Sequence, residues 1–260
     1  MLGYTNGSPV GEPDAPEGAR AQKDMAQEIE VKCKVEDLAA FRKTLARIGA
    51  RPVAAQGQTA GEGKRTALGR VHEMNELFDT PQGGFAKHGH LVRVRVEKRH
   101  KKNNRGARSE RVVLTYKSPA MRPSRVKNEA ARGLVRAGRH KIREEVEAEV
   151  GDAGALRHIL EEMGLRGWFR YEKYRTTYRL PRGQRWAKGL LIELDETPSG
   201  NYVELEGPAE AIDRAAGVLG FRPRDYITKS YLQIYLEDCR RRGVTPGDML
   251  FGPRNRKKLL

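Results

Sequence analysis

Charged residues occupy every second position in several short segments of this chain. Glu28, Glu30 and Lys32 alternate with Ile29 and Val31, so a strand over these residues has one charged face and one apolar face. The pattern recurs with either sign of charge at Arg93–Val96, Thr115–Lys117, Glu145–Glu147, Lys173–Arg175, Glu193–Asp195 and Glu204–Glu206. Carboxylate, ammonium and guanidinium groups are the side chains that hold metal ions and phosphates.

The alternation alone does not say which face of each strand points inward. For a single segment, the simplest interpretation is an ordinary antiparallel strand whose charges lie in water. These faces are nearly pure acid or pure base, however, whereas solvated faces usually also carry Ser, Thr, Asn and Gln. Seven such segments therefore favour an inside-out barrel, in which the lumen is charged and helices cover the apolar exterior.

A charged lumen of this kind would have a definite chemical use. Buried carboxylates are costly unless they are paired or bound to metal, and a carboxylate cluster without thiolates suits Mg²⁺ or Mn²⁺. Basic groups around the same cavity can hold a polyphosphate, so the implied ligand is a metal-bound triphosphate. The candidate acids are Glu28, Glu30, Glu145, Glu147, Glu193, Asp195, Glu204 and Glu206, and the candidate bases are Lys32, Arg93, Arg95, Lys117, Arg143, Lys173 and Arg175.

The elements that must position these residues can be read along the chain. We expect an α+β fold in which eight mostly antiparallel strands close into a barrel with helices packed outside, since strands of a parallel α/β sheet would read as continuous apolar runs. The strands are predicted at about 27–35, 71–79, 90–98, 110–118, 140–150, 169–180, 189–196 and 201–207. Helices are predicted at about 36–48, 152–163, 208–219 and 225–240.

The same reading divides the chain into three parts. Residues 1–24 are rich in Gly, Pro and Ala and are expected to be a flexible leader. Residues 25–240 form the tunnel domain, and 241–260 form a basic tail expected to be loosely docked or mobile. No segment reaches the roughly 20 apolar residues of a membrane span, and two cysteines suit a reducing compartment, so a soluble cytoplasmic protein is expected.

The charge balance predicts anionic partners. Fifty Lys and Arg against 34 Asp and Glu leave a formal charge of +16. Residues 98–143 hold 16 Lys and Arg against two Glu, so nearly all of the surplus lies there. This region is either a solvated loop or a surface for weak nucleic-acid contact.

Several other residues attract attention but have simpler explanations. Asp79 precedes Thr-Pro and is expected to order a turn. His88 and His90 have metal-like spacing without a third histidine nearby, which favours turn or solvent roles. Cys33 falls on the apolar face of the first strand and is expected to be a packed thiol. The Gly-rich segment 61–65 lacks the first glycine and the Ser or Thr of a phosphate loop.

The charged segments resemble, in order, the motifs of the CYTH family, the triphosphate tunnel metalloenzymes. Glu28-Ile-Glu30-Val-Lys32 matches the ExExK signature of that family. Seven more segments are similar to its later motifs: Phe78-Asp79-Thr80, Leu91-Val-Arg93-Val-Arg95, Thr115-Tyr-Lys117, Arg143-Glu-Glu145, Lys173-Tyr-Arg175, Leu194-Asp195 and Glu204-Leu-Glu206. The amino-acid sequences around Lys117, Arg143 and Lys173 are most similar to those of the class IV adenylate cyclase branch.

The resemblance implies a role for each residue. Divalent metal would be held by Glu28, Glu30, Glu145, Asp195, Glu204 and Glu206. Triphosphate would be bound by Lys32, Arg93, Arg95, Lys117, Arg143, Lys173 and Arg175, with Lys32, Lys173 and Arg175 also catalytic. The oligomeric state stays open, with a homodimer as one alternative.

The resemblance leaves more than one activity open. A class IV adenylate cyclase, converting ATP to cyclic AMP and pyrophosphate, is the first expectation. A triphosphatase acting on tripolyphosphate, thiamine triphosphate or a nucleoside triphosphate is the alternative with the same lining. A non-catalytic module that binds polyphosphate or nucleic acid is the third, but a simple polyanion binder has no use for acids beside its bases.

Overall fold

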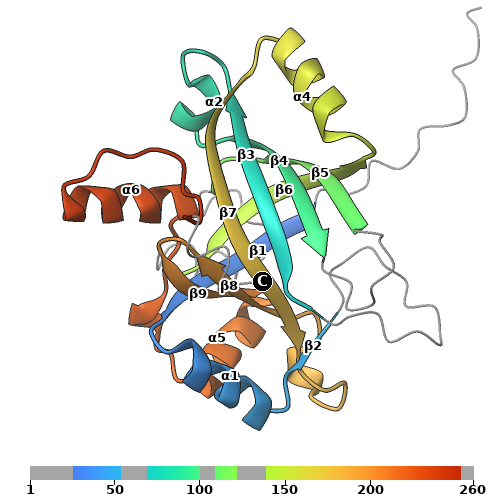
Figure 1. The fold of residues 1–260 in the computed structure, drawn as a ribbon. Helices are drawn as coiled ribbons and strands as arrows, with labels where there is room; N and C mark the ends of the chain where they lie inside the picture. The colour runs from blue at the N-terminus through green and yellow to red at the C-terminus, as the bar shows by residue number, and fades with distance from the viewer. Residues whose placement is uncertain (1–25, 54–68, 100–108, 122–138, 253–260) are drawn as a thin grey trace, which may run out of the picture.

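Eight antiparallel strands close into a barrel in the computed structural model, which describes residues 26–53, 69–99, 109–121 and 139–252 (Figure 1). The barrel strands follow the order β7-β3-β4-β5-β6-β1-β9-β8, and pairing of β8 with β7 closes it. They are β1 (Ala26–Val35), β3 (Val71–Asp79), β4 (Leu91–Arg99), β5 (Ser109–Lys117), β6 (Lys141–Val150), β7 (Arg166–Arg179), β8 (Leu191–Thr197) and β9 (Gly200–Glu206). The short β2 (Arg51–Pro52) pairs with β7 outside the ring. The predicted fold class is therefore confirmed.

The helices lie outside this barrel, as predicted (Figure 1). They are α1 (Leu38–Arg47), α2 (Gly84–Lys87), α4 (Ala153–Glu162), α5 (Ala209–Val218) and α6 (Tyr231–Arg242), with short 3₁₀ turns at Arg185–Ala187 and Pro223–Asp225. Asp152 is the N-cap of α4 and accepts a hydrogen bond from the backbone nitrogen of Ala155.

The last helix begins later than predicted. The sequence suggested a helix from about 225, whereas α6 starts at Tyr231 because Ser230 and Gln233 form a capping box there. The preceding residues have another use, since Ile227 exchanges two backbone hydrogen bonds with Lys32 of β1. An extended segment is therefore needed where the apolar spacing suggested a helix.

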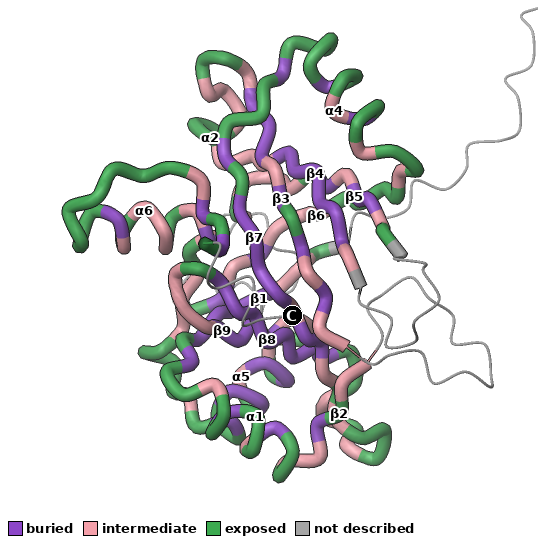
Figure 2. Tube along the Cα trace, in the orientation of Figure 1, coloured by how far each residue is buried: buried purple, intermediate pink, exposed green. Residues whose placement is uncertain are grey.

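The hydrophobic core lies between the outer face of the barrel and the helices. Val31, Leu194 and Leu205 are fully buried against Leu45 of α1 and Ile212 of α5. A second cluster packs the outward side chains of β4 and β5 against Leu156 and Leu160 of α4. Figure 2 shows buried residues concentrated along the barrel strands and on one side of α5. The apolar face of each alternating strand therefore points outward, toward the helices.

Part of the expected tail is firmly packed, which corrects the prediction of a loosely docked segment. The chain continues in α6 to Arg242, and Met249 and Phe251 are both buried. The backbone of Met249 bonds to Glu172 and Arg170 of β7. Backbone pairing and two buried apolar side chains hold this segment, and neither is visible as a pattern in a basic sequence. The expected leader and most of the basic 98–143 region fall outside the described residues.

Within the described ranges, no helix combines the length and apolar character that crossing a membrane would require.

Two isoleucines provide a test of where the core lies. Ile212 on α5 is fully buried, whereas Ile159 on α4 is 55% exposed. We expect Ile212→Ala to lower the free energy of unfolding by about 2–5 kcal/mol, because it leaves a cavity between α5 and the barrel. Ile159→Ala should change it by less than about 0.5 kcal/mol. Urea denaturation measures both, and equal effects would contradict a core between barrel and helices.

Candidate active site

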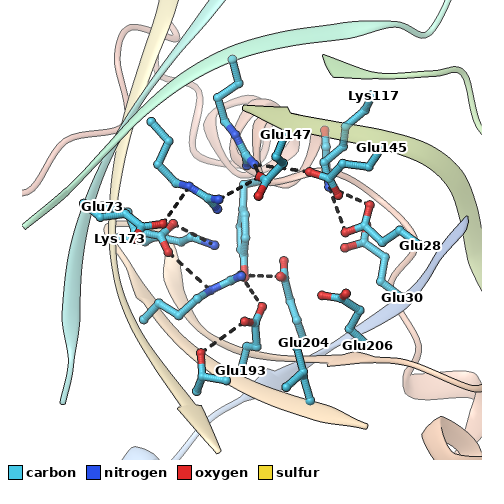
Figure 3. A pocket seen from close by; sticks show the side chains of 18 of the residues that line it. Glu28, Glu30, Glu73, Lys117, Glu145, Glu147, Lys173, Glu193, Glu204 and Glu206 are labelled. Atoms are coloured by element: carbon cyan, nitrogen blue, oxygen red, sulfur yellow. Dashed lines mark hydrogen bonds and ion pairs between the residues drawn. The ribbon is translucent and has the colours of Figure 1, made fainter. Parts of the chain in front are cut away.

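The barrel encloses a cavity of about 670 Å³ whose wall receives side chains from all eight barrel strands. The strand alternation that places Val31 outward places Glu30 and Lys32 inward. Figure 3 shows carboxylates and ammonium groups from opposite sides of the barrel pointing toward this common space. The charged lumen predicted from the sequence is therefore present.

Arg175 and Lys173 of β7 share a group of acids on one side of the lumen. Arg175 Nε donates to Asp195 at 2.7 Å, and Lys173 Nζ donates to the same carboxylate at 2.9 Å. The Arg175 guanidinium also contacts Glu193 and Glu204. One cation therefore links three acids that come from two neighbouring strands.

Three lysines share the acids of β1 on the opposite side. Lys117 Nζ lies 2.7 Å from Glu28 and 2.9 Å from Glu145. Lys32 bridges Glu30 and Glu204, with 3.1 Å to each carboxylate. Lys141 donates to Glu30 at 2.7 Å. Every one of these lysines therefore has an acid within hydrogen-bonding distance, as a buried ammonium group requires.

Arg93 and Arg95 of β4 converge on Glu147, which accepts from Arg95 at 2.8 Å and lies 3.5 Å from Arg93. Thr115 also donates to this carboxylate, at 2.9 Å. Glu147 and Glu193 were predicted from strand alternation as candidate acids of the lumen. Their contacts place both carboxylates in the charged wall.

Two groups in the described part of the wall have no ion-pair partner. Glu206 makes no hydrogen bond or salt bridge there, and the Arg143 guanidinium makes none either, its Nε being buried without an acceptor. Glu206 lies opposite Glu30 and Arg143 opposite Glu28 in the strand pairings of β1. The described wall thus has one acid and one cation that form no ion pair at contact distance.

The pKa values of the lumen acids divide into two groups. Burial raises the pKa of Glu206, and the negative charges of Glu193 and Glu28 add to this, to a value of about 8. Burial likewise raises the pKa of Glu193 and of Glu145 to about 7. Burial acts in the same direction on Glu204, but Lys32 and Arg175 outweigh it and hold its pKa well below the ordinary value. Around Glu206, Glu193 and Glu145, the wall therefore holds more carboxylate than the nearest cations neutralise.

This excess fits a hard divalent cation such as Mg²⁺ or Mn²⁺. The donors are carboxylate oxygens, and the acids near Glu206 repel each other in a buried site. Among the described residues, no three acidic, His or Cys side chains already converge on one point, because Glu28, Glu30 and Glu204 are held by basic groups. Glu206, with Glu28 and Glu193 nearby, is the best placed to hold an ion.

Most of the predicted site residues lie together in this wall. The cavity is lined by Glu28, Glu30, Lys32, Arg93, Arg95, Lys117, Arg143, Glu145, Lys173, Arg175, Glu204 and Glu206. Asp195 is the exception. It is fully buried behind the wall, and its carboxylate accepts from Lys173, Arg175 and Tyr231. That geometry suits a group that orients cations better than a metal ligand.

Sequence reasoning missed six charged or aromatic residues of the described wall, one of which is Arg111. Lys141 has the same strand alternation as Arg143, and Glu73 has the same as Lys173. The alternation was therefore visible in the sequence, but the segments around Lys141 and Glu73 also carry residues of other types. Glu97 follows Arg95 by two positions and could have been found in the same way. The other two are aromatic: Tyr171 has the same strand alternation as Lys173, whereas Tyr231 lies in a helix and its local pattern did not mark it.

The residues given simpler explanations lie outside this wall. The Asp79 carboxylate accepts from the backbone nitrogens of Phe85 and Ala86, both at 2.8 Å, so it orders the turn into α2. His88 contacts the carbonyl oxygen of Gly84, and His90 contacts the Tyr116 hydroxyl. Cys33 is a fully buried free thiol. The segment 61–65 falls outside the described residues.

The chain belongs to the CYTH family, since the CYTH domain family model matches residues 26–219. Members of this family are in general divalent-metal-dependent enzymes. Comparison with curated protein sequences finds no match.

Solved structures share the fold at low sequence identity. A proposed adenylate cyclase from Vibrio parahaemolyticus is 16% identical over 80% of this chain and 96% of its own, with a TM-score of 0.54. A Pyrococcus horikoshii protein is 20% identical over 81% and 99%, also with a TM-score of 0.54. A proposed adenylyl cyclase from Hippeastrum, described as having a dominant triphosphatase activity, is 20% identical over 84% and 97%. Its TM-score of 0.44 is too low to bear on this chain.

The raised pKa of Glu206 gives a pH-dependent prediction. A carboxyl whose pKa rises on folding from 4.5 to about 8 holds its proton longer in the folded chain. Its contribution to stability is therefore lost as pH rises through that window. Because Mg²⁺ replaces the proton, the rise in unfolding temperature on adding Mg²⁺ should be larger at about pH 8.5 than at about pH 6.

Thermal unfolding with and without Mg²⁺ at the two pH values measures this difference. Glu206→Gln should remove much of the pH dependence, whereas Glu162→Gln, at an exposed position on α4, should not. A Mg²⁺ shift of the same size at both pH values in the wild-type chain would contradict the assignment.

Proposed function

We propose that this CYTH protein is a Mg²⁺- or Mn²⁺-dependent enzyme that acts on a triphosphate, with conversion of ATP to cyclic AMP and pyrophosphate as its activity. The observation that carries the proposal is the charge of the wall. In its described part, nine acids (Glu28, Glu30, Glu73, Glu97, Glu145, Glu147, Glu193, Glu204 and Glu206) face nine bases (Lys32, Arg93, Arg95, Arg111, Lys117, Lys141, Arg143, Lys173 and Arg175).

Acids that equal the bases in number weaken the attraction of the wall for a bare triphosphate, which carries several negative charges. A divalent cation bound by the acids would shift the balance and leave the basic groups free to contact phosphate oxygens. A site that only bound polyanions would not need nine acids in its wall, five of them buried. The balance therefore supports a metal-dependent enzyme over a simple polyphosphate or nucleic-acid module.

Each group then has a role in the proposal. Glu206, with Glu28, Glu30, Glu145 and Glu204, would hold the metal, which neutralises charge that develops on the phosphates. Arg143 and Lys117 would bind phosphate oxygens, together with Arg93 and Arg95. Lys32, Lys173 and Arg175 would stabilise the transition state from deeper in the tunnel. In the cyclase reaction the ribose 3′-hydroxyl attacks the α-phosphorus, and pyrophosphate leaves.

The likeness to the Vibrio parahaemolyticus protein, itself a proposed adenylate cyclase, agrees with cyclisation but shows only a shared fold at 16% identity. A soluble cytoplasmic location, a homodimer and weak nucleic-acid contact through residues 98–143 remain part of the proposal. Of that basic region, residues 98–99, 109–121 and 139–143 fall within the described residues.

Hydrolysis is a second candidate, and one feature of the wall favours it. The aromatic side chains in the described lining are Tyr171 and Tyr231, and both are engaged. Tyr231 donates to Asp195, and Tyr171 stacks on Phe169 and contacts Arg93. A wall without a free ring to stack on a nucleobase suits inorganic tripolyphosphate as well as ATP. Thiamine triphosphate and nucleoside triphosphates are the other substrates of this alternative.

Product analysis separates the two reactions. The protein is incubated with Mn²⁺ and ATP, and in parallel with tripolyphosphate or thiamine triphosphate, and the products are resolved by chromatography. Cyclic AMP with pyrophosphate identifies a cyclase, whereas orthophosphate from any of the substrates identifies a triphosphatase. No turnover of any of them with either metal would refute the proposed enzyme.

Removing the charge of Glu206 should impair catalysis. We expect Glu206→Gln to lower metal-dependent turnover by at least about tenfold, because it removes the carboxylate that lacks a protein cation. Glu162→Gln, at an exposed position on α4, is the matched control and should keep wild-type turnover. Steady-state rates over a range of Mn²⁺ concentrations test this, and an unchanged rate in Glu206→Gln would refute the metal assignment.

Removing Arg143 should impair binding. Its guanidinium forms no ion pair or hydrogen bond among the described residues, although Glu28, Glu30 and Glu145 are close enough to attract it, so it can contact an anion without breaking an ion pair. Arg143→Ala is expected to raise KM for the triphosphate by about tenfold or more. Arg182→Ala, in an exposed turn, should leave KM unchanged. A wild-type KM in Arg143→Ala would place this side chain outside the phosphate site.

A further inference from the structure

Tyr231 reaches the tunnel wall from outside the part of the chain that defines the family. The CYTH match ends at residue 219, whereas Tyr231 is the first residue of α6. Its side chain is 7% exposed and lines the cavity. Two backbone hydrogen bonds between Ile227 and Lys32 fix the segment that leads into α6. The ring therefore has a defined position beside β1.

The hydroxyl group of Tyr231 is hydrogen-bonded to Asp195 within the same network that holds two of the proposed catalytic cations. It donates to Asp195 Oδ2 at 2.6 Å. Asp195 has no exposed surface and also accepts from Lys173 at 2.9 Å and from Arg175 at 2.7 Å. This single buried carboxylate therefore divides its negative charge among a phenol, an ammonium group and a guanidinium group.

The ring of Tyr231 contacts two ammonium groups as well. Lys173 Nζ lies 5.1 Å from the ring centroid, and Lys32 Nζ lies 5.5 Å from it. An aromatic face attracts a cation without taking up any of its N–H donors. Contacts with the rings of Tyr202 and Tyr171 hold the ring of Tyr231 in place. Both lysines thus keep donors that can turn toward the cavity.

We propose that Tyr231 is a positioning residue for triphosphate binding: its hydroxyl group takes part of the charge of Asp195, and its ring supports Lys32 and Lys173, so that these cations stay available to phosphate. The inference rests on the proposed function, because it assigns the tunnel a triphosphate. It also makes α6 a structural part of the site.

The contacts predict what removal of the hydroxyl group would do. Without the phenol, Asp195 would be neutralised by Lys173 and Arg175 alone, and each would interact with it more strongly. Both cations would then bind phosphate less well. Tyr231→Phe keeps the ring and should weaken triphosphate binding about three- to tenfold. Tyr231→Leu also removes the ring face and should weaken it by a further factor of about two to five.

The probe is the bismethylene analogue of tripolyphosphate, whose P–C–P bridges cannot be hydrolysed, titrated calorimetrically in excess Mg²⁺ into the full chain. Tyr235→Phe is the matched control, because Tyr235 lies on the same helix and its hydroxyl group bonds to the backbone nitrogen of Gly247 and to Cys239 and not to Asp195. Thermal unfolding shows that each variant is folded. The Mg²⁺ concentration that gives half of the thermal stabilisation is measured in parallel.

The expected result is weaker binding of the analogue by Tyr231→Phe, with wild-type binding by Tyr235→Phe and an unchanged Mg²⁺ midpoint in both. A purely structural role would shift the Mg²⁺ midpoint together with the affinity for the analogue, and that result would overturn the inference. Wild-type affinity in a folded Tyr231→Phe would overturn it as well. Failure of the wild-type chain to bind the Mg²⁺-bound analogue would refute both this inference and the proposed function. Binding that depends on Tyr231 without turnover of any triphosphate would refute the enzyme alone.

Discussion

Most buried charges of the described lumen are paired with a charge of opposite sign, and this pairing ties the electrostatics of the tunnel to the register of its strands. Lys32 is 3% exposed, and Glu204 directly opposite it on β9 supplies one of its two carboxylates. Arg175 and Asp195 form a similar facing pair on β7 and β8. Slippage of either pairing by one residue would turn these charges toward the helices and leave them buried without partners. The acid and base pattern therefore specifies the closed barrel as strongly as the apolar residues do.

Much of this architecture could be predicted because strand alternation has a period of two, which survives in a single sequence. Alternation located the eight strands and grouped the lumen residues, but it could not say which face was inside. The near-pure charge of the faces suggested the answer, and burial of Val31 beside an inward Lys32 confirms it. Tyr231 and the buried Met249 escaped prediction because their positions depend on the path of the chain after β9. The start of α6 was missed for the same reason, since Ile227 pairs with a strand almost 200 positions earlier.

The chemistry of the site was less predictable than its composition. A residue type does not reveal which partner it will meet, so Asp195 looked equivalent to Glu206, although the first lies among three donors and the second has none. The same limit applies to the reaction. Cyclisation and hydrolysis use nearly the same set of charged side chains. They differ in the attacking oxygen and in the phosphorus atom that it reaches, and this depends on the position of the triphosphate to within about an ångström. The alternation of residues along a strand does not determine positions this accurately.

The two faces of each barrel strand have different roles. On β1, Val31 and Cys33 pack among helices, while their neighbours Glu30 and Lys32 face the cavity. Folding free energy thus comes mainly from one set of alternate positions, and ligand recognition from the other. New lumen residues can be tried in opposite-charge pairs without disturbing the packing that holds the helices. A scaffold of this kind can diverge in substrate while keeping its shape, which makes the lumen a natural place to redesign specificity.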